Sequence, residues 1–262
     1  MDGHLEDLAF ADDHFFNDPY RVADICRGLI SVPSHPTWFA TARPDVFVKS
    51  AGRFVDLLAP AGCRKLLFGV ESGDESRRRQ LGKGVSTEDL FRCARLCEDH
   101  GIQADFTYIV GLPEETEAEL RATIEEAARL RLAHDGVTTK LFFYSPYPGT
   151  RLFGKAARLG MVHSRSLLEW GRYGDHDADK PWLSPGYRRR IRVASFYHSH
   201  MNGRKRAGLN ETVARRVLRA LSRARGHVGL YGLPLELAAS RAIRWLRQPG
   251  PKSLPRAIEE AT

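Results

Sequence analysis

Polar residues that could bind a charged ligand follow the apolar segments of this sequence, and the first of them are two adjacent aspartates. Asp12 and Asp13 come directly after the apolar run Leu8–Ala11, where a short buried strand would open into a loop. In sheets built from βα units, this end of a strand is where ligands bind. The pair is also typical of a simple turn, or of the cap of a helix that Asn17–Pro19 indicates.

Four further apolar segments end in comparable sequences. The second ends in RPD at 43–45, and the third ends in FGVESGDE, where Glu71 and Ser72 lie between two glycines. The fourth ends in IVGLPEET and the fifth in FFYSPYPGT. Small residues let a ligand approach the backbone, and polar groups at a strand end can satisfy a polar ligand. Because all five segments end in this way, we predict a ligand site at the mouth of a sheet.

The segments that must position these residues alternate between strand and helix patterns. The strand candidates start roughly 30 to 40 residues apart, which is the length of a strand plus a returning helix. They are Leu8–Ala11, Trp38–Ala42, Lys65–Val70, Ala104–Val110 and Lys140–Tyr144. This rhythm predicts an α/β fold with a parallel sheet, either open or rolled into a partial (β/α) barrel.

Two of the intervening segments have the capping residues and the apolar spacing of helices. The segment 86–101 begins with Ser86 or Thr87 as its N-cap, and Thr116 and Glu119 are spaced as the capping box of the next helix. Apolar residues recur on one face of each helix: Leu90, Cys93, Ala94 and Cys97 in the first, and Leu120, Ile124, Ala127 and Leu130 or Arg131 in the second.

Charge divides the chain of 262 residues into two unequal regions. Residues 1–179 carry 22 Lys and Arg against 28 Asp and Glu, whereas residues 180–262 carry 18 against 4. The acidic region has the character of a catalytic or binding domain. The basic region has the character of a segment that meets an anionic partner.

The composition excludes several classes of protein. No apolar run is long enough to cross a bilayer, and no basic segment followed by an apolar core marks a signal peptide. The four cysteines, Cys26, Cys63, Cys93 and Cys97, are too few and too scattered for a disulfide framework. We therefore expect a cytoplasmic protein.

The motifs LAFADDHFF, LLFGVESGD, LGKGVSTED, HGIQADFTYIVGLPEET and FFYSPYPGT together resemble the radical S-adenosylmethionine (SAM) enzymes, and the similarity extends from Leu5 to Gly160. The most similar branch is the one whose members often carry an upstream cobalamin-binding domain. The resemblance implies a partial (β/α) barrel of six strands, of which about five βα units are present. It also implies a [4Fe–4S] cluster on a C-x-x-x-C-x-x-C loop, which reduces SAM to a 5′-deoxyadenosyl radical that takes a hydrogen from the substrate.

The resemblance also assigns cofactor-binding roles to seven residues. Asp12 and Asp13 fall where the family places carboxylates against the amino group of the cofactor, and a charge-assisted hydrogen bond suits that task. Glu71 and Ser72 fall where members bind the ribose hydroxyls. Lys83 falls where several members bind the methionine carboxylate, and Val110 and Gly111 where they hold the adenine. The alternatives are an ion pair between Glu71 and Arg77, and a solvated Lys83.

One family feature is absent, because no C-x-x-x-C-x-x-C occurs in the sequence and no metal ligand is assigned. Cys93 and Cys97 lie one helical turn apart on a face that also carries Leu90, so we interpret them as core residues. Cys26 and Cys63 are interpreted as residues of helices that face away from the strand ends. Three explanations remain open: a truncated chain that lacks the first strand and cluster loop, a degenerate relative, or a second polypeptide that supplies the missing strand. Truncation is favoured, since an exposed edge on a parallel sheet is a liability.

Beyond the resemblance we expect a linker over residues 161–185 and a basic helical extension over 186–262, after a barrel over 1–160. Asp175, His176, Asp177 and Asp179 are interpreted as a solvated linker, not as a metal site. Two basic helices are expected, Glu211–Arg225 with Val213, Val217 and Leu221 on one face, and Pro234–Arg247. Docking on the chain's own acidic barrel is the favoured explanation of this charge, and an anionic membrane surface is the next. Nucleic acid is disfavoured because few aromatic residues interleave with the basic ones.

These observations leave three functional hypotheses. The first is the C-terminal portion of a radical SAM enzyme that performs methyl transfer, cyclisation or rearrangement at an unactivated carbon of a small-molecule substrate, and that is inactive as this chain alone. Its cluster ligands, and cobalamin if it is used, would come from a missing N-terminal segment or a separate chain. The second is a cluster-less, non-catalytic nucleotide-binding relative, and the third is a fragment of an RNA-modifying enzyme. No catalytic residue is assigned.

Overall fold

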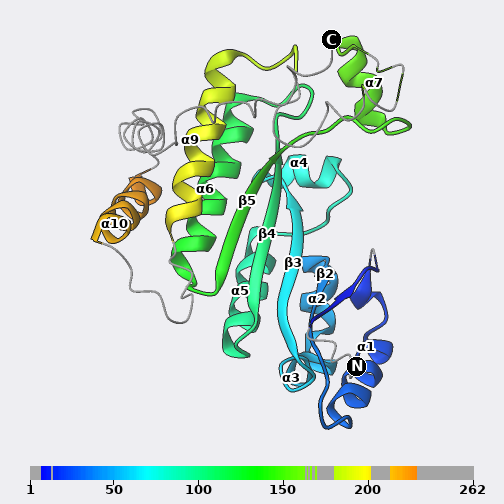
Figure 1. The fold of residues 1–262 in the computed structure, drawn as a ribbon. Coiled ribbons are helices and arrows are strands. Elements are labelled where there is room, and N and C mark those ends of the chain that lie inside the picture. The colour runs from blue at the N-terminus through cyan, green and yellow to red at the C-terminus, as the bar shows by residue number, and fades with distance from the viewer. Residues whose placement is uncertain are drawn as a thin grey trace, which may run out of the picture.

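Five parallel strands form one sheet in which spatial order follows chain order (Figure 1). The structure is a computed structural model that describes residues 7–12, 14–162, 164, 166, 169, 180–201 and 213–228. The parallel α/β architecture predicted from the sequence is confirmed, and the strand ends differ from the predicted ones by a few residues. The strands are β1 (Asp7–Phe10), β2 (Thr37–Ala42), β3 (Cys63–Glu71), β4 (Gln103–Val110) and β5 (Val137–Phe143).

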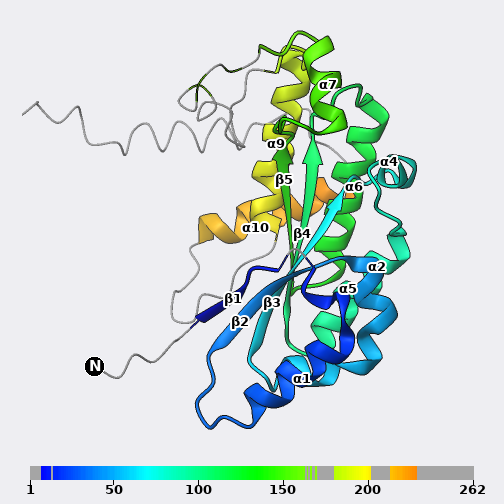
Figure 2. The ribbon, with the colours of Figure 1, turned by 90° about the vertical axis from the view of Figure 1, so that its right-hand side faces the viewer.

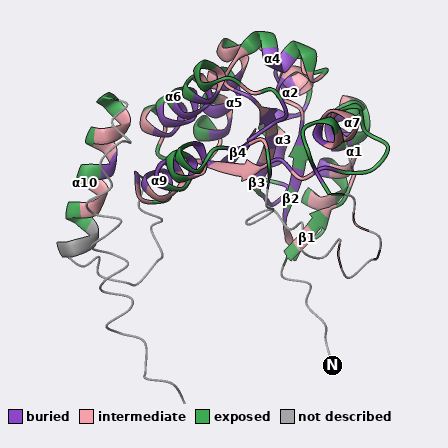
Figure 3. Ribbon diagram, turned by 90° about the horizontal axis from the view of Figure 1, so that it is seen from above, coloured by how far each residue is buried: buried purple, intermediate pink, exposed green. Residues whose placement is uncertain are grey.

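Helices connect the strands and lie along the outside of the curved sheet, as the view from above shows (Figure 3). Parallel neighbours need such crossovers, because the chain must return to the same end of the sheet before the next strand begins. The helical elements are η1 (Phe15–Asn17), α1 (Pro19–Ile30), α2 (Pro44–Ser50), η2 (Ala51–Arg53), α3 (Val55–Leu58), α4 (Glu75–Gln80), α5 (Thr87–Asp99), α6 (Glu117–Ala133), α7 (Arg151–Arg158), α9 (Pro185–Met201) and α10 (Val213–Val228). None of the described helices has an apolar stretch that could cross a bilayer.

The two faces of the sheet differ in character. Along β3, Leu66, Phe68 and Val70 are buried in the main hydrophobic core, and the side chains between them are less buried. Because side chains alternate across a strand, Lys65 and Glu71 lie on the opposite, inner face. A polar inner face at the carboxyl ends of the strands is where a ligand could reach the backbone.

The helix starts follow the expected capping chemistry. Asp18 caps α1, and Thr116 forms the predicted capping box with Glu119 at the start of α6. Ser86 is the cap of α5 and forms a second capping box with Asp89. The alternative cap, Thr87, is instead the first residue inside the helix, and its hydroxyl serves a buried network described below.

The C-terminal part contributes a second hydrophobic cluster, which packs against β4, β5 and α6. The members of this cluster include Tyr187, Ile191, Ala194, Tyr197 and Met201 of α9 together with Val110, Leu120, Ile124 and Ala128. In Figure 2, α9 lies beside β5 and α10 crosses next to it. Helix α9 therefore belongs to the packed body of the protein.

Helix α10 does not bury the apolar face that the sequence indicates. Val217 is 53% exposed and Leu221 is 40% exposed, so the expected apolar face does not face the body. The buried position is Ser222, and Gly226 lies against Met201. The expected helix Pro234–Arg247 and the acidic segment 175–179 lie outside the described residues, as does the side chain of Val213. The division into 1–160, 161–185 and 186–262 stays a prediction.

Candidate functional site

The carboxyl end of β3 carries an unusual backbone conformation at Glu71. Its φ is 73°, in the left-handed region that residues with a Cβ seldom adopt. The pairing of β3 with β4 shifts between Gly69 and Glu71, so the strand also carries a bulge at its last residues. Such strained conformations persist only where the surroundings hold them, and they cluster at ligand sites.

The side chain of Glu71 makes an ion pair with Lys83 at 3.0 Å, and both side chains are mostly buried. A Cβ at Gly69 would lie 2.9 Å from Glu71 Oε1 and 3.4 Å from Lys83 Nζ. The two charged groups therefore lie directly over the backbone of Gly69. The alternative pair of Glu71 with Arg77 is wrong, because Arg77 binds both oxygens of Glu119 at 3.0 Å.

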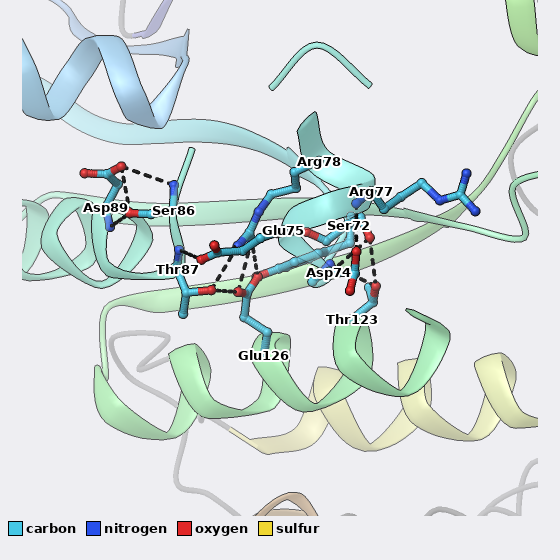
Figure 4. Close-up of polar contacts among 12 residues, drawn as sticks. Ser72, Asp74, Glu75, Arg77, Arg78, Ser86, Thr87, Asp89, Thr123 and Glu126 are labelled. Atoms are coloured by element: carbon cyan, nitrogen blue, oxygen red, sulfur yellow. Dashed lines mark hydrogen bonds and ion pairs between the residues drawn. The ribbon is translucent and has the colours of Figure 1, made fainter. Parts of the chain in front are cut away.

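A polar network beneath this loop fixes the residues that follow Glu71 (Figure 4). Ser72 is fully buried, and its hydroxyl accepts from the backbone N–H of Asp74 at 3.2 Å and lies 3.5 Å from Thr123 Oγ1. The backbone N–H of Gly73 donates to the same Thr123 oxygen at 2.9 Å. Gly73 lies so close to α6 that a Cβ there would be 2.4 Å from Thr123 Cα. The loop is thus fastened to the first half of α6.

At the centre of the network is a buried ion pair between Arg78 and Glu126. Arg78 is completely buried, and its guanidinium donates to Glu126 Oε1 at 2.8 Å and to the Ser72 carbonyl at 3.2 Å. Thr87 accepts from Arg78 at 2.9 Å and donates to Glu126 at 2.6 Å. Burial raises the pKa of Glu126, and the Arg78 charge opposes that rise. Burial and the Glu126 charge likewise raise the pKa of Tyr108, whose hydroxyl donates to Glu126.

The end of β4 is covered by the C-terminal segment of the described chain. Gly111 has a φ of 76°; its N–H donates to Glu115 Oε2 at 2.6 Å, and its carbonyl accepts from the Trp182 indole at 3.0 Å. The Tyr187 hydroxyl also donates to Glu115 Oε2. Burial raises the pKa of Glu115 to about 7, and these two hydrogen bonds oppose the rise. Two elements that are distant in the sequence therefore meet at Gly111.

The structure places the seven predicted cofactor residues unequally. It brings Glu71, Ser72 and Lys83 together after β3, with Ser72 turned inward to hold the loop. Gly111 follows the neighbouring strand β4, while the side chain of Val110 is fully buried in the α6 and α9 cluster. Only the backbone of Val110 remains for a ligand, and its carbonyl already accepts from the N–H of Tyr144.

Asp12 follows β1, which is an edge strand of the sheet. Asp12 makes an ion pair with Arg21 at 3.0 Å, and both side chains are substantially exposed. Asp13 lies outside the described residues. In the structure, the Asp12 side chain therefore forms a local ion pair with a residue of α1.

Sequence reasoning did not single out Arg78, Glu126 or Glu115. The signals were present but weak: three consecutive arginines at 77–79, one acidic residue on the face of α6 that packs inward, and a second glutamate in GLPEET. A charged residue in a helix is usually solvated, so only packing reveals which one is buried.

The four cysteines are buried and unpaired by disulfides. Burial raises the pKa of Cys26 to about 11 and that of Cys97 to about 12, as for thiols that pack as core residues. Cys93 donates to the Pro44 carbonyl at 3.5 Å. Cys63 was expected in a helix, and that expectation is wrong, because it starts β3. Among the described residues no three His, Cys, Asp or Glu side chains are grouped to hold a metal, so they do not fit a [4Fe–4S] cluster.

The structure is an α/β fold with a parallel sheet and a charged pair at the carboxyl end of one strand. Residues 28–127 match the family model of the Radical SAM superfamily. This match confirms the predicted resemblance over those residues.

Comparisons with other proteins give the extent of the similarity. The chain is 26% identical over 169 residues to an uncharacterized methyltransferase of Pyrococcus horikoshii, covering 64% of this chain and 35% of that protein. The chain therefore spans about a third of that curated relative. The cobalamin-dependent SAM radical enzyme OxsB with aqua-cobalamin has a similar fold, with a TM-score of 0.55, 16% identity and coverage of 92% of this chain and 42% of OxsB. The radical SAM methyltransferase TsrM of Kitasatospora setae gives a TM-score of 0.48 at 23% identity, over 60% of this chain and 32% of TsrM.

Proposed function

We propose that this chain is the SAM-binding, C-terminal portion of a radical SAM enzyme of the cobalamin-associated branch. Its reaction would be methyl transfer, cyclisation or rearrangement at an unactivated carbon of a small molecule. The observation that carries the proposal is the charged pair of Glu71 and Lys83 at the end of β3, inside the family-matched residues, with Glu71 at a positive φ. A carboxylate that is carried on a strained backbone and lies beside a cation is suited to a ligand that has both hydroxyl and carboxylate groups.

The two residues would divide the ligand between them. The Glu71 carboxylate can accept hydrogen bonds from both ribose hydroxyls, and the Lys83 ammonium can bind the methionine carboxylate. Each now satisfies the other at 3.0 Å, so the bound ligand would insert its own groups beside an existing ion pair. The buried Ser72 holds the loop in place for this task, and the backbone at Gly111 would border the adenine. Asp12 and Asp13 remain proposed for the amino group.

The cluster chemistry would come from outside this sequence. The described residues do not fit a cluster, so we propose that a segment or a separate chain carrying C-x-x-x-C-x-x-C completes the enzyme. Cobalamin, if it is used, would sit in an upstream domain. This chain alone would then bind SAM but perform no radical chemistry.

The second candidate is a cluster-less relative that binds the nucleotide and has no catalytic activity. What supports this candidate is that the described residues include no group of three His, Cys, Asp or Glu side chains that could bind a cluster. Both candidates require the same SAM site, and they differ only in what the rest of the polypeptide supplies.

The proposal is tested by calorimetric titration of the purified chain with SAM. We expect saturable binding, and Glu71→Ala should weaken it by about 1–3 kcal/mol through loss of a charged hydrogen bond. The matched control is Glu88→Gln, an exposed position on α5, which should leave the affinity unchanged. Equal affinities of the wild type and Glu71→Ala would overturn the site.

The two candidates are then separated by the coding DNA upstream of Met1. An in-frame strand followed by three correctly spaced cysteines, with iron reconstitution of the extended protein, would support the enzyme. A stop codon followed by unrelated sequence would support the cluster-less relative.

A further inference from the structure

Helix α10 turns several of its apolar side chains away from the rest of the described molecule. Val217, Leu221 and Val228 are 53%, 40% and 64% exposed, and Ala220 and Ala224 are exposed as well. Residues three, four and seven positions apart lie on one side of a helix. These five residues, called the apolar stripe below, therefore form one continuous exposed surface along α10.

The helix is attached to the body by a different face. Ser222 is fully buried, and its hydroxyl donates to the Leu218 carbonyl at 2.7 Å. A Cβ at Gly226 would lie 2.7 Å from Met201 Cε of α9, and the Arg225 guanidinium lies 4.9 Å from the centre of the Tyr197 ring. The apolar stripe is thus not needed to hold α10 in place. Figure 3 shows α10 at the periphery, outside α9.

The charge of α10 has one sign. Residues 213–228 contain five arginines and no aspartate or glutamate. At 100° per residue, Arg216, Arg219 and Arg223 form a row along one edge of the apolar stripe, and Arg216 is exposed. A helix with an apolar side, a row of arginines beside it and no acidic residue has the composition of a helix that lies in a membrane interface.

We propose that α10 docks the protein on an anionic membrane surface, with the apolar stripe in the headgroup region and the arginine row on the lipid phosphates. Charge complementarity selects this partner. Single-stranded nucleic acid would be bound by aromatic side chains among the basic ones, and α10 has none and would leave the stripe in water. The chain's own C-terminal residues 229–262 carry more basic than acidic residues, so they do not complement the arginine row.

The test is co-sedimentation of the full chain with vesicles of two compositions. One set is pure phosphatidylcholine, and the other has one part phosphatidylglycerol to two parts phosphatidylcholine. We expect binding to the anionic vesicles that weakens as salt is added. The double variant Val217→Glu, Leu221→Glu should lower the partition coefficient by about tenfold or more, because it places charge on the surface that enters the interface.

Matched variants separate the helix from general effects. Val32→Glu alters an apolar side chain that is 48% exposed elsewhere in the chain, and it should bind vesicles like the wild type. Arg216→Gln with Arg219→Gln should lower binding to anionic vesicles by about tenfold and leave binding to pure phosphatidylcholine unchanged. Because the altered side chains are on the surface, circular dichroism should show unchanged folding.

Three results would overturn the proposal. The first is equal binding to the two kinds of vesicle. The second is full vesicle binding by the stripe variant, which would assign the contact to another segment of the chain. The third is salt-dependent binding of polyuridylic acid without vesicle binding, which would make the partner a nucleic acid.

Discussion

The loop after β3 and the helix α10 are both rich in arginine, but the fold uses the charge in opposite ways. Arg78 is completely buried against Glu126, and Arg77 is bound by both oxygens of Glu119. Arg216 is exposed on a helix that has no acidic residue. A buried, paired guanidinium fixes a backbone, whereas guanidinium groups along a peripheral helix can meet an anionic partner. We interpret the first region as a rigid support and propose the second as a contact surface.

The buried pair should produce the largest effect. Arg78→Met leaves the Glu126 carboxylate without its cation, so we expect the free energy of unfolding to fall by about 3–5 kcal/mol. The double variant Arg78→Met, Glu126→Leu leaves no buried charge unpaired and should recover most of this loss. Denaturant unfolding of both variants measures the two values. A loss below about 1 kcal/mol in the single variant would contradict a rigid network.

Each of the two regions contains a glycine that lies close to another element: Gly73 contacts the backbone of α6, and Gly226 contacts a side chain of α9. Substituting the two glycines compares how tightly the two regions are packed. Gly73→Ala would press a Cβ on the backbone of Thr123 at 2.4 Å, which should destabilise the protein by about 1–3 kcal/mol and weaken SAM binding. Gly226→Ala meets the flexible end of Met201 instead and gains helix propensity, so its unfolding free energy should stay close to the wild type. Similar losses in both variants would mean that α10 packs as rigidly as the loop.

The Glu115 carboxyl predicts a pH dependence of stability. Burial raises its pKa from the ordinary 4.5 to about 7 in the folded chain, so between these values the folded state binds more protons than the unfolded state. The stability from this group is complete below about pH 4.5 and is lost as the pH rises through about 7, by about 1–3 kcal/mol.

A neutral amide at this position tests that window. Glu115→Gln keeps an acceptor for Gly111 and Tyr187 but cannot ionise, so the decline between these pH values should flatten. Thermal unfolding across the range provides the measurement, and Glu88→Gln serves as the control. An unchanged slope in Glu115→Gln would assign the pH dependence to other groups.

The smallest effect is expected at a helix cap remote from the charged pair. Thr116→Ala removes the hydroxyl that accepts from the N–H of Glu119, which should cost about 1 kcal/mol of stability. SAM affinity should not change, because the cap touches none of the proposed ligand groups. Thr87→Ala should cost more than Thr116→Ala, since the Thr87 hydroxyl bridges Arg78 and Glu126. Equal losses would show that Thr87 acts only through its helix.

The sequence by itself determined the order and type of the elements. Apolar runs at the spacing of βα units predicted five parallel strands, and Thr116 with Glu119 predicted the start of α6, because these signals are local and depend on neighbours along the chain. The sequence likewise indicated Glu71 as a polar residue at a strand end, and the family resemblance added Lys83. It also predicted that Cys93 and Cys97 are core residues, and both are buried.

Only the tertiary structure decided which partner each of these groups has. The sequence offered Arg77 as an ion-pair partner for Glu71, and the fold pairs Glu71 with Lys83 instead, with both side chains close to Gly69. The sequence placed Val217 and Leu221 on one face of α10 without saying which face packs, and the fold buries Ser222 and sets Gly226 against Met201 instead. Periodicity reveals that a helix has two faces. Which face is covered depends on the shape and charge of a surface that is assembled from distant segments.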